Sequence, residues 1–165
     1  MLSSVPLWLH VLGAAVWVGS QVMMFVVVIP SLRTAEPATR GPVLAAVTKR
    51  FGYLGLAALL LLALTGLDNL NRYAPSDLLE FRYGSILAVK LVMFAAIVVL
   101  TAVHALYLGP KLLALQTRLP PGDSVADEAM RSLRARSVGI SVAVLLLSLA
   151  ILFCGVLLGS AYAYG

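Results

Sequence analysis

The sequence predicts an all-α integral membrane protein, a bundle of four transmembrane helices with both termini on the outer side. Of its 165 residues, 61% are hydrophobic and 12% are charged. Soluble domains carry about 45–50% apolar and about 25% charged residues, so the composition excludes a soluble domain. Four apolar runs exceed the roughly 20 residues needed to cross a hydrocarbon core. They lack the alternation of a barrel strand, and within lipid a helix is the remaining way to pair every backbone amide.

The boundaries of the helices follow from the apolar runs and from the prolines beside them. We expect helices over about 6–29, 46–67, 83–108 and 138–162, within a single transmembrane domain comprising residues 1–165. Pro30 should end the first helix, and Gly109-Pro110 should end the third. A short surface helix over about 124–136 should lead into the fourth helix. The first run has no basic residue before Arg33, so we interpret it as a retained helix rather than a signal peptide.

Lysine and arginine residues set the orientation. Nine of them lie in or beside the connections after the first and third helices: Arg33, Arg40, Lys49, Arg50, Lys111, Arg118, Arg131, Arg134 and Arg136. The loop after the second helix has only Arg72 and Arg82, and the termini have none. The positive-inside rule therefore predicts both termini on the extracytoplasmic side of a bacterial-type inner membrane. This topology explains the net charge of +5 better than nucleic-acid binding does.

Two stripes of polar residues are the candidate functional positions, because such residues are costly inside a membrane. At 100° per residue, one stripe forms on the first helix and one on the third. Their members are His10, Trp17, Gln21 and Met24 on the first helix, and Lys90, Thr101 and His104 on the third.

Depth in the membrane separates the candidates into two levels. The first and third helices run in the same direction, so His10 should lie level with Lys90, and Met24 with His104. At a rise of 1.5 Å per residue the two levels are roughly 20 Å apart. His10 and His104 therefore cannot ligate the same metal ion or haem. The single cysteine, Cys154, and Asp68 should lie at the outer level.

Each candidate also has a purely structural interpretation. His10 could bond to a neighbouring helix, His104 could meet lipid headgroups, and Lys90 could extend to the surface. Met24 and Cys154 could simply pack. Small residues on the second and fourth helices are expected to permit close helix packing.

Several short motifs resemble the CopD-type copper resistance membrane domains. They are His10, Trp17–Ser20, Ile29–Arg33, Thr65–Leu67 and Tyr83–Leu91, and the similarity spans about residues 6 to 108. The resemblance implies a copper-handling membrane protein. Imidazole suits copper, and thioether or thiolate suits Cu(I), so the candidate metal ligands are His10, His104, Met24 and Cys154.

The spacing of His10 and Trp17, with Lys90-Leu91, is also similar to the HemJ-type protoporphyrinogen oxidases. That resemblance implies a b-type haem redox protein, an oxidoreductase if it binds haem, with His10 as the ligand candidate. Lys90 could pair with a haem propionate, and the other candidate contacts are Trp17, Gln21, Thr101 and His104.

Three functions stay open at this point. Copper binding, transport or homeostasis is the first, haem b redox chemistry the second, and a cofactor-free assembly subunit the third. The expected partners are the lipid bilayer and a copper-binding or electron-transfer protein, and a homo-oligomer is compatible with the sequence. No hydrolytic triad, phosphate loop or zinc spacing occurs, which argues against a hydrolase or a nucleotide-driven pump.

Overall fold

The computed structural model describes residues 4–73, 82–118 and 124–160. Four of its helical stretches are long and apolar enough to cross a membrane: Val5–Thr34, Ala38–Arg72, Arg82–Leu112 and Glu128–Leu158. The described residues contain no strand. The all-α class and the four predicted membrane helices are therefore confirmed. The side of the membrane on which the termini lie stays a prediction.

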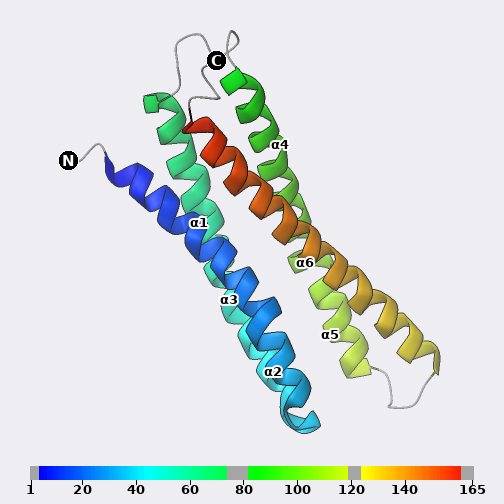
Figure 1. The fold of residues 1–165 in the computed structure, drawn as a ribbon. Coiled ribbons are helices and arrows are strands. Elements are labelled where there is room, and N and C mark those ends of the chain that lie inside the picture. The colour runs from blue at the N-terminus through cyan, green and yellow to red at the C-terminus, as the bar shows by residue number, and fades with distance from the viewer. Residues whose placement is uncertain (1–3, 74–81, 119–123, 161–165) are drawn as a thin grey trace. The chain divides into compact units, whose positions relative to one another are not determined.

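The chain divides into two compact units, and the first covers Met1–Phe81. It consists of α1 (Val5–Met23), the π-helical turn η2 (Met24–Val28), α2 (Ile29–Thr34) and α3 (Pro37–Tyr73). The first three are continuous, and Ala35 ends them with an extended backbone. Because this connection is short, α3 turns back and packs along α1 as an antiparallel hairpin (Figure 1).

The second unit, Arg82–Gly165, is a hairpin of the same kind. It consists of α4 (Arg82–Val103), the π-helical turn η3 (His104–Leu108), α5 (Gly109–Arg118) and α6 (Ser124–Leu158). The principal packing contact joins α4 to α6. The prediction of a single domain over the whole chain stays a prediction.

The expected ends of the first and third helices at proline were wrong. The helix continues through Pro30 to Thr34, and through Pro110 to Arg118. Proline lacks an N–H and its ring clashes with the carbonyl four residues earlier in an α-helix. A π-helical turn precedes each proline, and this wider turn lets the chain pass without a break.

The second and fourth helices are longer than the sequence predicted. α3 begins at Pro37 rather than 46 and includes Pro42. α6 runs unbroken from Ser124 to Leu158, so the predicted surface helix over 124–136 is helical but is not a separate element. At 1.5 Å per residue these helices are about 50–55 Å long and exceed a hydrocarbon core of about 30 Å. The predicted end of the fourth helix at 162 lies outside the described residues.

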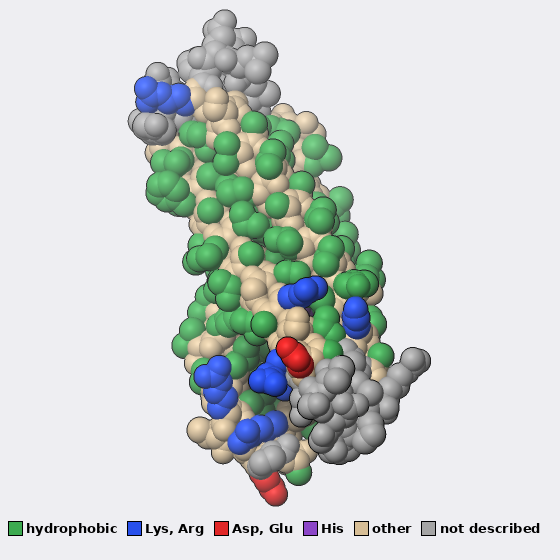
Figure 2. Space-filling model, turned by 90° about the vertical axis from the view of Figure 1, so that its right-hand side faces the viewer, with side chains coloured by type: hydrophobic (Ala, Val, Ile, Leu, Met, Phe, Trp, Pro, Cys, Tyr) green, Lys and Arg blue, Asp and Glu red, His purple; other side chains and the backbone are tan. Residues whose placement is uncertain are grey.

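The exposed surface of the helices is mostly apolar. Apolar side chains dominate the upper half of the face in Figure 2, and Lys and Arg side chains lie at its upper end and in its lower half. Leu64, Val92 and Leu106 are 70–80% exposed. The apolar surface is larger than soluble proteins expose to water, and contact with lipid tails would cover it.

Candidate functional site

A hydrogen bond between α1 and α3 holds the imidazole of His10. Its Nδ1 lies 2.9 Å from Oγ1 of Thr65. The Thr65 hydroxyl donates its own proton to the Leu61 carbonyl oxygen, 2.6 Å away. The hydroxyl must therefore accept from His10, which assigns the imidazole proton to Nδ1 and the ring lone pair to Nε2. Nε2 is thus the nitrogen that can ligate a metal ion.

Glycines on α3 allow the α1 side chains to approach closely. A Cβ at Gly66 would lie 3.3 Å from Cε1 of His10, and a Cβ at Gly55 would lie 3.1 Å from Cζ3 of Trp17. Trp17 is only 8% exposed. His10 and Trp17, two turns apart, therefore both lie against α3, and any larger residue at either glycine would displace a ring.

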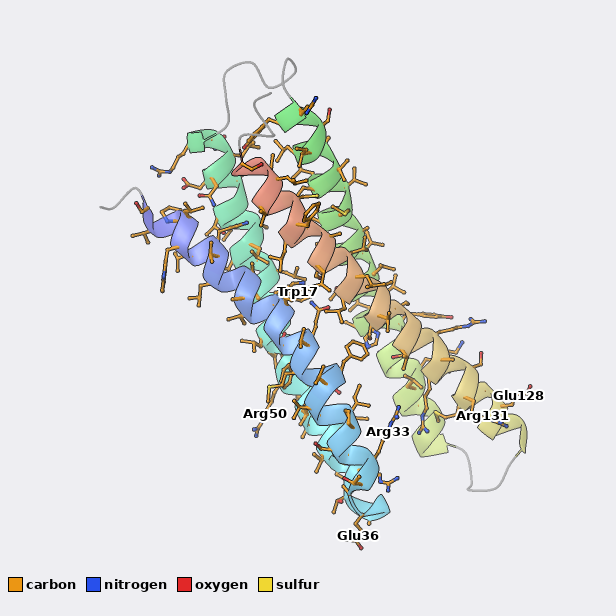
Figure 3. The ribbon with its side chains drawn as sticks, viewed as in Figure 1. Trp17, Arg33, Glu36, Arg50, Glu128 and Arg131 are labelled. Atoms are coloured by element: carbon orange, nitrogen blue, oxygen red, sulfur yellow. The ribbon has the colours of Figure 1, made fainter. Side chains whose placement is uncertain are left out.

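The rest of the α1 stripe is bound to its own helix. Nε2 of Gln21 donates to the Trp17 carbonyl oxygen at 3.2 Å, and Oγ of Ser20 donates to the same oxygen at 2.9 Å. Met24 is half-buried and begins the π-helical turn η2. Figure 3 shows Arg33 and Glu36 toward the α2–α3 turn and Trp17 farther along the hairpin.

Lys90 lies between the two helices of the second unit. A Cβ at Gly155 of α6 would lie 3.8 Å from Nζ of Lys90. The neighbouring Cys154 is a free, buried cysteine on the same helix as Gly155. The predicted common level of Lys90 and Cys154 is therefore consistent with the contacts within this unit.

His104 lies where its helix changes from α-helical to π-helical geometry. It is the first residue of η3, and its Nδ1 is buried without a hydrogen-bond partner among the described residues. Thr101, one turn earlier, is half-buried. A buried nitrogen of this kind is costly unless a ligand engages it, so His104 keeps its candidacy as a metal ligand.

The predicted groupings of candidate residues draw on both units of the chain. His10 and Met24 belong to the first unit, and Lys90, His104 and Cys154 to the second. The expected pairing of residues by depth across the two units therefore stays a prediction. Asp68 forms an exposed ion pair with Arg72, at 2.7 Å. Across residues 4–73, 82–118 and 124–160, no three His, Cys, Asp or Glu side chains gather as a metal-binding cluster.

The contacts around His10 bear on the haem interpretation. The edge of its ring rests on Gly66 at van der Waals distance, and its Nδ1 is bonded to Thr65. These contacts occupy the Nδ1 edge of the ring, so a metal ion or a haem iron would each have to bind at Nε2. The haem interpretation therefore stays a prediction.

Sequence reasoning assigned Thr65 a packing role only, and it overlooked the bond to His10. Thr65 is 7% exposed. The sequence did contain a signal for this bond, the adjacent pair Thr65 and Gly66. A threonine hydroxyl can bond to an imidazole, and a neighbouring glycine leaves room for the ring to approach. The identity of the facing helix was needed to connect Thr65 with His10.

Comparison with known proteins supplies one match. A family model described as copper resistance protein D, CopD, matches residues 45–158. The match includes α6, where the sequence resemblance had thinned out, and it begins after the helix that carries His10. No curated protein and no solved structure matches the chain.

Proposed function

The chain belongs to the CopD family of copper resistance proteins and is a multi-pass membrane protein, and from this premise we propose that it binds copper through His10 and passes the metal across the bilayer. The observation that carries the proposal is the bond from Nδ1 of His10 to Thr65. Metal-ligating histidines almost always donate their other ring N–H to a fixed acceptor, which orients the ring and raises its basicity.

Among the residues that the structure describes, no three His, Cys, Asp or Glu side chains gather around His10, and a site with few protein donors would suit transfer of the metal. Imidazole is a good ligand for copper. Coordination positions left open at the ion allow a carrier to deliver copper by ligand exchange. The partner expected on chemical grounds is therefore a copper-binding protein or a small thiol or imidazole carrier.

Onward passage would use the soft and imidazole donors that begin the two π-helical turns. Met24 offers a thioether, and His104 offers a buried nitrogen without a hydrogen-bond partner among the described residues. With both termini extracytoplasmic, His10 is expected near the outer end of the first membrane helix and Met24 near its inner end. Copper would then move between an outer and an inner position about 20 Å apart.

Cys154 is the weakest of the four candidate ligands. Its thiolate would suit Cu(I), but the Lys90 ammonium lies beside the adjacent Gly155. While it carries its charge, this ammonium would repel a metal cation. We therefore assign copper binding to His10 first.

The experiment compares His10→Ala and His104→Ala with the unmodified chain. Cu(I) is titrated anaerobically into purified protein in mild detergent, against a competing chelator, and copper accumulation is measured in cells expressing each variant. We expect His10→Ala to lose the tight site and His104→Ala to keep it, while both change accumulation. Ser141→Ala is the control, because it removes a half-buried hydroxyl that bonds only to its own helix in the described contacts.

Two results would overturn the proposal. Copper affinity unchanged in His10→Ala would remove its central residue. A Soret band in the visible spectrum that disappears in His10→Ala would assign the histidine to haem instead.

A further inference from the structure

The first helix of each hairpin contains the same sequence of elements, and equivalent residues in the two helices differ by 80 in number. The π-helical turns Met24–Val28 and His104–Leu108 are equivalent at this offset. In each, the residue after the turn donates its N–H to the first residue of the turn, and a proline follows directly. The hydrogen bond belongs to any π-helical turn of this length, so the shared design is indicated by position: the turns begin 14 residues after His10 and 14 residues after Lys90, and each is followed by one residue and then proline.

The second helices also correspond, at an offset of 89. Four residues of α3 are buried, and three of them map onto buried residues of α6. The pairs are Gly55 with Val144, Leu59 with Ser148, and Thr65 with Cys154. The face that α3 presents within its hairpin is therefore repeated by α6 in the same register.

The contacts between helices follow the same two offsets. His10 lies against Gly66, and Lys90, its equivalent, lies against Gly155, the equivalent of Gly66. Seven residues further along, Trp17 and its equivalent Ile97 are both buried, at 8% and 1% exposed. The agreement thus extends from the backbone to the side chains that fill each hairpin.

We infer that the chain consists of two copies of one helical hairpin with one common binding position, and that Lys90 and Cys154 hold in the second copy the place of His10 and Thr65 in the first. The first copy presents a neutral imidazole, oriented by a hydroxyl, to a metal cation. The second copy carries a flexible amine at the same place and a thiol in place of the orienting hydroxyl. The first copy is thus the copper-binding one, and Lys90 stands in the second where a ligating imidazole would be needed.

This inference rests on the proposed copper function, and a conversion experiment tests it. Lys90→His with Cys154→Thr gives the second hairpin the residues of the first. We expect the unmodified chain to bind one copper and the double variant to bind two. Adding His10→Ala to the double variant should leave one copper, held by the second hairpin alone.

The conversion needs both substitutions, because the threonine must accept the proton of the new histidine. Lys90→His with Cys154→Val is the matched control, and we expect it to bind the second copper at least tenfold more weakly. A double variant that is monodisperse and still binds one copper would overturn the inference and leave the proposed function intact. An unmodified chain that binds copper with no dependence on His10 would overturn the proposed function instead.

A second measurement tests the duplication without copper. Gly13 contacts Leu62 in the first hairpin, and the offsets map this pair onto Met93 and Ile151. In a Cys154→Ser background, cysteines at Met93 and Ile151 should form a disulfide on mild oxidation, as cysteines at Gly13 and Leu62 should. Cysteines at Val92 and Leu152, one position earlier and one later, point outward and should not. Cross-linking of the outward pair in preference to the mapped pair would refute the common register.

Discussion

Replacing Thr65 by valine isolates the hydrogen bond that orients His10. Valine keeps the branched shape of threonine and substitutes a methyl group for the hydroxyl. The change removes the acceptor 2.9 Å from Nδ1 of His10 and also the bond from the hydroxyl to the Leu61 carbonyl. The ring stays beside Gly66 but loses the acceptor that fixes the proton on Nδ1.

Two effects set the size of the change. Losing the orienting partner of a metal-ligating histidine typically weakens metal binding about 10- to 100-fold, which corresponds to about 1.4–2.7 kcal/mol. Leaving a buried N–H without an acceptor costs about 1–3 kcal/mol. The second effect acts on the metal-free protein as well, so it lowers thermal stability whether or not copper is present.

The assay is an anaerobic competition titration of Cu(I), combined with thermal unfolding of the same samples in detergent. Thr65→Val should bind copper about 10- to 100-fold more weakly. Thr65→Ser, which keeps the hydroxyl, should stay within about threefold of the unmodified chain. If Thr65→Val loses stability while its copper affinity stays within about twofold, the bond is structural only and the reasoning is refuted.

Two further predictions concern the approach to His10 and the topology. Gly66→Ala should weaken copper binding several-fold, because its Cβ would lie 3.3 Å from the His10 ring. Gly52→Ala is the control, since its Cβ meets open space and should leave the copper affinity unchanged. Equal copper affinities in the two variants, measured by the same titration, would contradict the packing argument. Single cysteines in a cysteine-free background test the orientation: a membrane-impermeant maleimide should label Ser4→Cys in intact cells, and Thr39→Cys and Glu128→Cys only after permeabilisation. Labelling of the latter two in intact cells would reverse the topology.

The four membrane helices could be predicted from the sequence because lipid imposes a simple rule on apolar length. The helix ends could not, since they depend on how each proline is accommodated. Pro30 and Pro110 were expected to stop their helices, but a π-helical turn before each lets the helix continue. Hydropathy contains no signal for such a turn.

The candidate residues could be found from the sequence, but their partners could not. The polarity and helical spacing of His10 and Lys90 mark both as unusual in a membrane helix. Which helix each residue faces depends on tertiary pairing, and this pairing connects His10 with Thr65 and Lys90 with Gly155. The spacing of 80 residues between matching stripes was visible in the sequence, yet its meaning emerged only when both hairpins showed the same turn and the same buried face.

X-ray absorption at the copper edge tests the central claim most directly. The unmodified chain, loaded with one equivalent of Cu(I), should show the outer-shell scattering of a bound imidazole. His10→Ala, loaded in the same way, should lose that scattering together with the bound metal. A copper environment that is unchanged in His10→Ala, or that contains sulfur and no imidazole in the unmodified chain, would contradict the account.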